Sequence, residues 1–285
     1  MQLLGLFGHP VDHSLSPVMH KAAIKALGLN EEFIYLAFDI SPSSLSEAAS
    51  ALRVLDFRGV NITIPLKEKI IPFLDRLDGP ARLMGAVNVI VNERGCLTGF
   101  NTDGRGFLRS LEENTEMKPE KLKVLIFGAG GAARAVAMAL GLAGVKEIVI
   151  INRNPDRAVR VAGMLNELGI TVKAYGNVPK DIKKEIKTAD LIVNTTSVGM
   201  VSNPGSLIEG YVSFLNRKQV VCDIIYQPLE TLFIKQARAN GCHVVSGLDM
   251  LLYQGAEAFH LWTGQEAPVD IMREALEENL KENKI

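Results

Sequence analysis

Val124-Leu125-Ile126-Phe127-Gly128-Ala129-Gly130-Gly131-Ala132-Ala133-Arg134 is the stretch that says most about the fold of this chain. An apolar run enters a glycine turn, and a run of helix-forming residues follows it. A strand, a glycine turn and a helix start, in this order, expose main-chain N–H groups to the phosphates of a dinucleotide. Gly128 would allow the tight turn, Gly130 would let the phosphates approach, and Ala133 would let the helix pack closely on the strand.

Strand and helix patterns alternate on both sides of this turn, which indicates an α/β fold. After it we expect a helix over 155–168 and strands over 147–151, 171–174, 191–194, 220–224 and 243–245. Before it we expect helices over 16–27, 43–55 and 67–74, and strands over 3–8, 33–38, 59–65, 86–93 and 96–99. The tail carries two helices, 250–263 and 269–280, and no further strand.

The predicted fold class is therefore a two-domain α/β protein. Residues 1–103 form an N-terminal open α/β substrate-binding and catalytic domain, completed by the C-terminal helices of 248–285. Residues 104–247 are expected to form a Rossmann-like, doubly wound domain of the kind that binds a dinucleotide.

Composition limits the partners of the chain. A net charge of −1 over 285 residues provides no field to attract nucleic acid or an anionic membrane. The apolar segment 124–145 contains Arg134, which would cost about 2.5–3.5 kcal/mol at a bilayer centre, so we expect no membrane span. Three cysteines without CxxC spacing and the lack of a signal-peptide pattern favour a cytoplasmic protein. We expect a small-molecule substrate and allow for a homodimer.

The end of the strand 147–151 bears on the choice of cofactor. An acidic residue usually stands there when the ribose 2′-hydroxyl is free. This chain instead has the neutral or basic residues Asn152, Arg153, Asn154 and Arg157, which suit a 2′-phosphate. The sequence therefore favours NADP over NAD.

A few polar residues stand where chemistry is possible. Ser14 and Ser16 offer two hydroxyl groups beside a helix N-terminus, which suits a small carboxylate, although Ser16 could equally be only an N-cap. Lys67 could be a plain surface cation, and Asp103 only a helix cap. Together they would form a proton-transfer pair for a carbonyl that is reduced by hydride. Asn88 adds an amide able to hold a hydroxyl group.

The histidines His9, His13 and His20 do not have the spacing of a metal site, and neither a cysteine nor a clear carboxylate joins them. We therefore expect no metal.

Eight motifs in order along the whole chain resemble the shikimate dehydrogenase family. They are Gly8-His9-Pro10-Val11-x-His13-Ser14-x-Ser16-Pro17, Asn61-Ile62-Thr63-Ile64-Pro65-x-Lys67, Gly85-Ala86-Val87-Asn88, Asn101-Thr102-Asp103-x-x-Gly106, Gly128-Ala129-Gly130-Gly131-Ala132-Ala133, Asn194-Thr195-Thr196-Ser197-x-Gly199-Met200, Asp223-x-x-Tyr226-x-Pro228 and Gly247-x-x-Met250-Leu251-x-x-Gln254-Gly255. His9 and Lys21 stand where asparagine is common in the family.

The resemblance implies reversible, NADPH-dependent reduction of 3-dehydroshikimate to shikimate, a step in aromatic amino acid biosynthesis. It implies that Lys67 and Asp103 are catalytic and that Ser14 and Ser16 hold the carboxylate. The implied ligands of the ring hydroxyls are Thr63, Asn88, Asp103 and Gln254, and Asn61 and Tyr226 would also line the substrate pocket. The implied contacts to NADP are Gly128, Ala129, Gly130, Gly131, Ala132, Asn152, Arg153, Asn154, Arg157, Thr195, Ser197, Ile224 and Gly247.

Alternatives of different kinds stay open at this level. A relative that uses quinate, or NAD, would share the same motifs, but two full serine side chains favour the planar carboxylate-bearing carbon of shikimate. A non-catalytic NADP-binding sensor would not need both Lys67 and Asp103. An enzyme of the methylene-folate dehydrogenase kind shares the two-domain layout, but the paired serines suit a small hydroxy acid better.

Overall fold

The computed structural model describes residues 1–176 and 182–282, which form two compact units. The first unit comprises Met1–Gly106 and the described part of Leu251–Ile285, and the second comprises Phe107–Met250. The divisions lie three residues after the predicted boundaries, inside the helices α4 (Asp103–Asn114) and α9 (Gly247–Thr263). The first unit is thus made from both ends of the chain.

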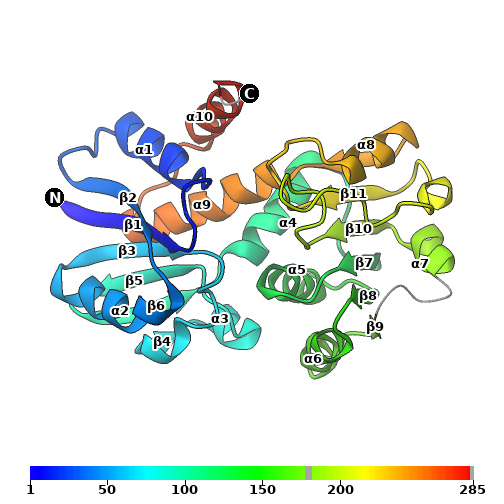
Figure 1. Ribbon diagram of the computed structural model, residues 1–285, viewed down its shortest axis with the longest axis horizontal. Coiled ribbons are helices and arrows are strands. Elements are labelled where there is room, and N and C mark those ends of the chain that lie inside the picture. The colour runs from blue at the N-terminus through cyan, green and yellow to red at the C-terminus, as the bar shows by residue number, and fades with distance from the viewer. Residues whose placement is uncertain (177–181, 283–285) are drawn as a thin grey trace. The chain divides into compact units, whose positions relative to one another are not determined.

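In the described residues of the first unit, six strands form one mixed sheet in the order β2-β1-β3-β5-β6-β4 (Figure 1). β1 pairs in parallel with β2 and β3, whereas β5 is antiparallel to both β3 and β6. The elements of this unit besides α4 and α9 are β1 (Gln2–Gly8), α1 (Ser16–Ala26), β2 (Phe33–Asp39), η1 (Pro42–Ser44), α2 (Leu45–Val54), β3 (Phe57–Ile62), η2 (Ile71–Phe73), β4 (Arg76–Leu77), α3 (Gly79–Met84), β5 (Val89–Glu93), β6 (Cys96–Phe100) and α10 (Val269–Glu282).

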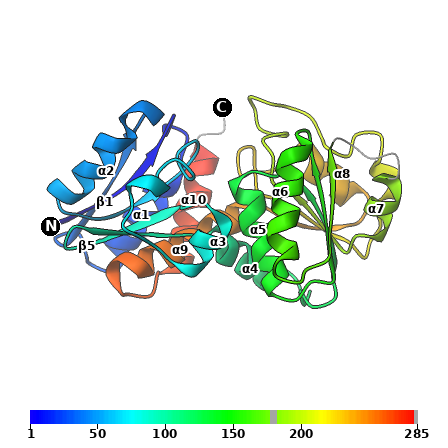
Figure 2. The same ribbon diagram turned by 90° about the horizontal axis from the view of Figure 1, so that it is seen from below.

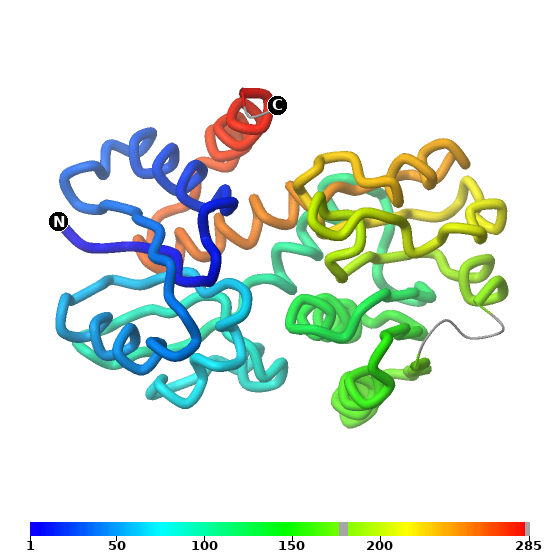
Figure 3. Tube along the Cα trace, viewed as in Figure 1, coloured from blue at the N-terminus to red at the C-terminus, as the bar shows by residue number. Residues whose placement is uncertain are grey.

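Alternating side chains bury both faces of this sheet. The α2 residues Leu45 and Leu52 share a core with Phe7 of β1 and Val60 of β3. Neighbouring positions in β3 face the other way, and a Cβ on Gly59 would collide with Trp262 of α9. The last helix returns beside the first, because α10 packs against α1 (Figure 3).

One predicted element of this unit is wrong. The helix expected over 67–74 is a series of turns that ends in the short 3₁₀ helix η2. Pro72 lies in this segment, and a proline removes a main-chain donor and clashes with the preceding helical turn. The segment therefore carries Lys67 on an irregular turn.

The described residues of the second unit contain six parallel strands in the order β12-β11-β10-β7-β8-β9. Numbered within the unit, the strands lie as 6-5-4-1-2-3, which is the order of a dinucleotide-binding fold. Its elements are β7 (Lys123–Phe127), α5 (Gly131–Leu142), β8 (Glu147–Asn152), α6 (Pro155–Asn166), β9 (Val172–Gly176), α7 (Ile182–Thr188), β10 (Leu191–Asn194), η3 (Val212–Phe214), β11 (Val220–Asp223), α8 (Leu232–Ala239) and β12 (His243–Val245).

Helices cover both faces of this second sheet. Alternate strand residues such as Leu125 and Val149 form a core with Ile186 of α7 and Phe233 of α8. α5 and α6 lie together on the opposite face, in front of the strands in Figure 2. The predicted doubly wound α/β arrangement is confirmed. Within the described residues, no helix has the length and apolar character needed to cross a membrane.

Candidate functional site

Lys67 and Asp103 meet in the first unit although 36 positions separate them in the chain. Lys67 lies on the turn that follows β3, where its carbonyl accepts a hydrogen bond of 2.8 Å from the N–H of Val87. Asp103 is the first residue of α4. The Lys67 Nζ donates to Asp103 Oδ2 at 2.5 Å, with 21% of the lysine and 7% of the aspartate side chain exposed. A largely desolvated amine and acid are thus held in contact.

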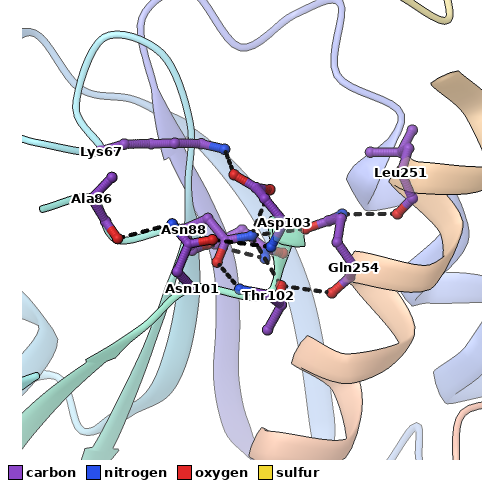
Figure 4. Close-up of polar contacts among 9 residues, drawn as sticks. Lys67, Ala86, Asn88, Asn101, Thr102, Asp103, Leu251 and Gln254 are labelled. Carbon is purple, nitrogen blue, oxygen red and sulfur yellow. Dashed lines mark hydrogen bonds and ion pairs between the residues drawn. The ribbon is translucent and has the colours of Figure 1, made fainter. Parts of the chain in front are cut away.

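Asn88 fixes the other oxygen of this carboxylate (Figure 4). Its Oδ1 accepts a hydrogen bond of 2.8 Å from the main-chain N–H of Thr102, so the amide has only one orientation available. The Nδ2 group then donates to Asp103 Oδ1 at 2.9 Å. Asp103 therefore cannot rotate about its side chain without breaking bonds on both sides.

Two residues that the sequence did not single out complete this network. Thr102 accepts from Asn88 Nδ2 at 2.9 Å and donates to the main-chain carbonyl of Gln254 at 3.0 Å. Asn101 accepts from the N–H of Asp103 and donates to Ala86 O. Both belong to the Asn101-Thr102-Asp103 motif, whose run of three consecutive polar residues was the available signal. We call Lys67, Asn88, Asn101, Thr102, Asp103 and Gln254 the Lys67 cluster.

Gln254 comes from α9, more than 150 residues further along the chain. Its Oε1 lies 3.2 Å from Asn88 Nδ2, and its Nε2 donates to Leu251 O at 2.8 Å. Gly106 makes this approach possible, because a Cβ at that position would lie 2.6 Å from the main-chain nitrogen of Gln254.

Two further predicted substrate residues, Asn61 and Thr63, lie at the end of β3. Asn61 is buried on β3 and reaches Asn88 O with its Nδ2 at 3.4 Å. Thr63 follows the end of β3, where its N–H binds Phe7 O at 2.9 Å and its methyl group faces Gly8. In residues 1–176 and 182–282, the hydrogen bonds of the Lys67 cluster do not extend to the side chain of Thr63.

The two serines precede and begin α1. Ser14 Oγ accepts a hydrogen bond of 3.3 Å from the N–H of Ser16. The alternative role of Ser16 as the N-cap is wrong, because Leu15 occupies that position and Ser16 is already helical. Ser16 is buried, whereas Ser14 is partly exposed.

The second unit contains the glycine turn that the sequence predicts. Gly128 has a φ of 114°, and a Cβ there would lie 2.4 Å from Thr195 Oγ1. A Cβ on Gly130 would meet no atom within 4 Å, so open space lies beside the N-terminus of α5. Ala133 is buried, as close helix–strand packing requires. A bare backbone facing open space suits a pyrophosphate, and the residues present therefore fit a dinucleotide.

Most of the predicted cofactor residues share two adjoining hollows. One, of about 320 Å³, is lined by Phe127, Gly128, Ala129, Gly130, Ile151, Asn152, Arg153, Thr195, Thr196, Ser197, Val198 and Leu207. The other, of about 370 Å³, is lined by Asn152, Arg153, Asn154 and Arg157. Asn154 caps α6 by accepting a hydrogen bond from the main-chain N–H of Arg157. Arg153 and Arg157 are both exposed. Gly131 and Ala132 follow as the first residues of α5.

Ile224 and Gly247 lie together elsewhere in the second unit, because a Cβ on Gly247 would be 2.3 Å from the carbonyl of Ile224. Tyr226 also belongs to this unit, and burial raises the pKa of its hydroxyl. Asp223, at the end of β11, binds Asn194, Thr231 and the N–H of Ile225, and burial raises the pKa of its carboxyl to about 6. Asp223 thus ties the ends of β10 and β11 to the segment that carries Ile224 and Tyr226.

Comparisons with known proteins match shikimate dehydrogenases along most of the chain. Family models described as the shikimate dehydrogenase substrate binding domain, shikimate/quinate 5-dehydrogenase and the shikimate 5′-dehydrogenase C-terminal domain match residues 6–90, 111–224 and 247–277. Shikimate dehydrogenase (NADP(+)) of Moorella thermoacetica is 51% identical over 280 residues, which cover 97% of this chain and 92% of that protein.

Solved structures show the same similarity. The shikimate 5-dehydrogenase of Listeria monocytogenes, in complex with shikimate and NAD, is 37% identical with a TM-score of 0.90, covering 97% of this chain and 96% of that one. The quinate dehydrogenase of Corynebacterium glutamicum, in complex with NAD, is 37% identical with a TM-score of 0.88, covering 97% and 99%. The ordered motifs, the fold and these matches together show that the chain belongs to the shikimate dehydrogenase family.

Proposed function

We propose that this protein is an NADP-dependent shikimate dehydrogenase, which reversibly reduces 3-dehydroshikimate to shikimate. The contact between Lys67 and Asp103, with Asn88 holding the second carboxylate oxygen, is the observation that carries this proposal. It supplies a proton donor beside a fixed acceptor, as the reduction of a carbonyl to an alcohol requires.

The proton steps follow from the number of hydrogens on the Lys67 ammonium group. An ammonium group has three hydrogens, and only one is needed for the bond to Asp103 Oδ2. Held by the second unit, NADPH would supply the hydride for the carbonyl carbon. Lys67 donates a second hydrogen bond to the carbonyl oxygen, stabilises the alkoxide as it develops and gives it the proton. In the oxidation of shikimate, the neutral amine takes the hydroxyl proton.

The other residues of the first unit would position the substrate. Ser14 and Ser16 would bind the carboxylate beside the N-terminus of α1, and Thr63, Asn88, Asp103 and Gln254 would bind ring hydroxyls. Asn61 and Tyr226 would also line the substrate pocket. This assignment is supported by the carboxylate preference of helix N-termini and by the network that joins Asn61, Asn88, Asp103 and Gln254.

The second unit would bind NADP. The pyrophosphate would lie against Gly128, Ala129 and Gly130 at the start of α5, where Gly131 and Ala132 follow. The 2′-phosphate would bind in the hollow lined by Asn152, Arg153, Asn154 and Arg157. Thr195 and Ser197 would line the groove, and Ile224 and Gly247 would contact the nicotinamide end.

Steady-state oxidation of shikimate and of quinate with NADP⁺ and with NAD⁺, in all four pairings, tests this proposal. Absorbance of the reduced nicotinamide reports the rate. We expect the highest kcat/KM with shikimate and NADP⁺. A higher value with quinate would favour a quinate dehydrogenase like the relative in Corynebacterium glutamicum. Tight NADP⁺ binding without turnover in any pairing would indicate a sensor.

We also propose that the protein acts in the cytoplasm and that a homodimer is its assembly in solution. Light scattering coupled to gel filtration measures the molar mass, and one chain of 31.0 kDa sets the scale.

A further inference from the structure

Behind the proposed substrate site, a buried hydroxyl group connects two of its residues. Tyr35 lies on β2 and is 1% exposed. Its hydroxyl donates to Asn61 Oδ1 at 2.7 Å. Burial raises the pKa of Tyr35 well above its ordinary value, and a hydrogen bond with the Ser16 side chain opposes that shift. Tyr35 therefore contacts Ser16 and Asn61 but is not itself among the predicted ligands.

The hydrogen bond from Tyr35 occupies one end of the Asn61 amide, so that only the other end can bind a ligand. The Tyr35 hydroxyl donates to Asn61 Oδ1, and the carbonyl of Asn88 on the other side can only accept, so the carbonyl end of the amide lies on Tyr35. The Nδ2 end is left to face Asn88 O, at 3.4 Å. This is long for an N–H···O bond, and the same carbonyl already accepts from the N–H of Ile62 at 2.8 Å. A hydrogen of Asn61 is thus only weakly used.

Aromatic packing holds Tyr35 in this position. The ring of His20 stacks on Tyr35 with centroids 4.5 Å apart and an interplanar angle of 17°. Burial lowers the pKa of His20 to about 3, although the nearby Asn61 side chain opposes the shift, so the imidazole is neutral at physiological pH. Trp262 packs beside both rings, with its centroid 5.3 Å from His20 and 6.1 Å from Tyr35. The hydroxyl therefore has little freedom to leave Asn61.

We propose that Tyr35 is a positioning residue, which fixes the Asn61 amide with its NH₂ group as the hydrogen-bond donor toward the Lys67 cluster. The site then selects, at this position, a substrate oxygen that accepts a hydrogen bond. This inference rests on the proposed function, because it explains the orientation of Asn61, which that function assigns to the substrate site.

Tyr35→Phe removes only the hydroxyl and leaves the ring that packs on His20. The buried Asn61 carbonyl then lacks its donor, and the amide turns to find another. We expect the KM for shikimate to rise about tenfold, the effect of one lost hydrogen bond to a ligand, and kcat and the KM for NADP⁺ to change by less than about twofold. Tyr253→Phe is the matched control, since its hydroxyl binds Arg273 at 3.0 Å away from the cluster. It should leave the KM for shikimate unchanged.

A double-mutant cycle separates positioning from general loss of structure. In an Asn61→Ala background, adding Tyr35→Phe should change the KM by less than about twofold, because Tyr35 acts on the substrate through Asn61 and not through Ser16. A full tenfold effect in that background, or an unchanged KM in Tyr35→Phe alone, would overturn the proposal.

Asn61→Asp provides a second test that does not depend on the folding of Tyr35→Phe. The aspartate can still accept from Tyr35 but has no N–H to donate. We expect it to weaken shikimate binding, measured by calorimetry without cofactor, at least as much as Asn61→Ala does. Wild-type affinity in Asn61→Asp would refute the inference. Absence of shikimate turnover in the unaltered protein would instead refute the proposed function itself.

Discussion

At the scale of single residues, the partly buried position of the Lys67 amine depends on its ion pair with Asp103. The pair is mostly removed from water, and desolvation of two charges is offset only where geometry and further hydrogen bonds are good. Asn88 provides one of those bonds to Asp103. A lysine a few positions away, Lys69, is exposed on the same turn and has no such partner among the described hydrogen bonds and ion pairs.

Lys67→Ala removes the proposed proton donor. Because a general acid contributes about 10²–10⁴-fold, we expect kcat for shikimate oxidation to fall by that factor. The affinity for NADP⁺, measured by calorimetry, should change less than about twofold, since the glycine turn lies in the other unit. Lys69→Ala is the control and should keep wild-type kcat. A normal turnover number in Lys67→Ala would exclude this residue from the mechanism.

At the scale of elements, the β7–turn–α5 segment uses its glycines for different reasons. Gly128 adopts a left-handed φ and lies against Thr195, so only glycine fits without strain. Gly130 lies in ordinary extended backbone with open space where a side chain would be. Glycine is needed at position 128 for the backbone conformation, whereas at position 130 it leaves space for a ligand.

Alanine at each of these two positions should separate stability from binding. Gly128→Ala should lower the free energy of unfolding by about 1–3 kcal/mol, measured by urea denaturation, through the strained φ and the contact with Thr195. Gly130→Ala should keep near wild-type stability but lose at least about tenfold in NADP⁺ affinity. Equal NADP⁺ affinity in Gly130→Ala and the wild type would place the pyrophosphate elsewhere.

The Asp223 carboxyl group joins the ends of β10 and β11, and burial raises its pKa to about 6. The folded state therefore favours the protonated form, and the stability that protonated Asp223 contributes is fully present below about pH 4. It is lost as the pH rises through about 6, and the total is of order 3 kcal/mol. Asp223→Asn cannot ionise. The difference in free energy of unfolding between variant and wild type should therefore grow in favour of the variant from pH 4 to pH 7, in denaturant titrations at several pH values. A constant difference would contradict the shift.

At the scale of the whole molecule, the first unit is completed only by the C-terminal end of the chain. Trp262, the single tryptophan, is 1% exposed and donates from Nε1 to Ile90 O at 3.0 Å. Its own carbonyl accepts from Arg58 Nε at 2.7 Å. Helix α9 is thus attached to β3 and β5, and the same helix supplies Gln254 to the Lys67 cluster.

Because Trp262 lies in the first unit, its fluorescence should report the unfolding of that unit. A ligand at one hundred times its Kd stabilises the state that binds it by about 2.7 kcal/mol. We therefore expect saturating shikimate to raise the urea midpoint seen by fluorescence more than saturating NADP⁺ does. Far-UV circular dichroism, which averages both units, provides the comparison. Equal shifts from the two ligands at the fluorescence midpoint would show that the units unfold as one.

The amino-acid sequence by itself determined the strand–turn–helix at Gly128, the alternation of strands and helices, and the family. These features depend on residues close together in the chain, where periodicity and glycine placement act directly. The helix expected over 67–74 failed because Pro72 and the packing of a turn outweighed the local pattern. Only the tertiary structure decided that Asn88 takes one amide orientation, that Thr102 binds Gln254, and that Tyr35 reaches Asn61. Those contacts join segments 14 to 152 residues apart, and nothing in the local sequence of either partner specifies which distant group it will meet.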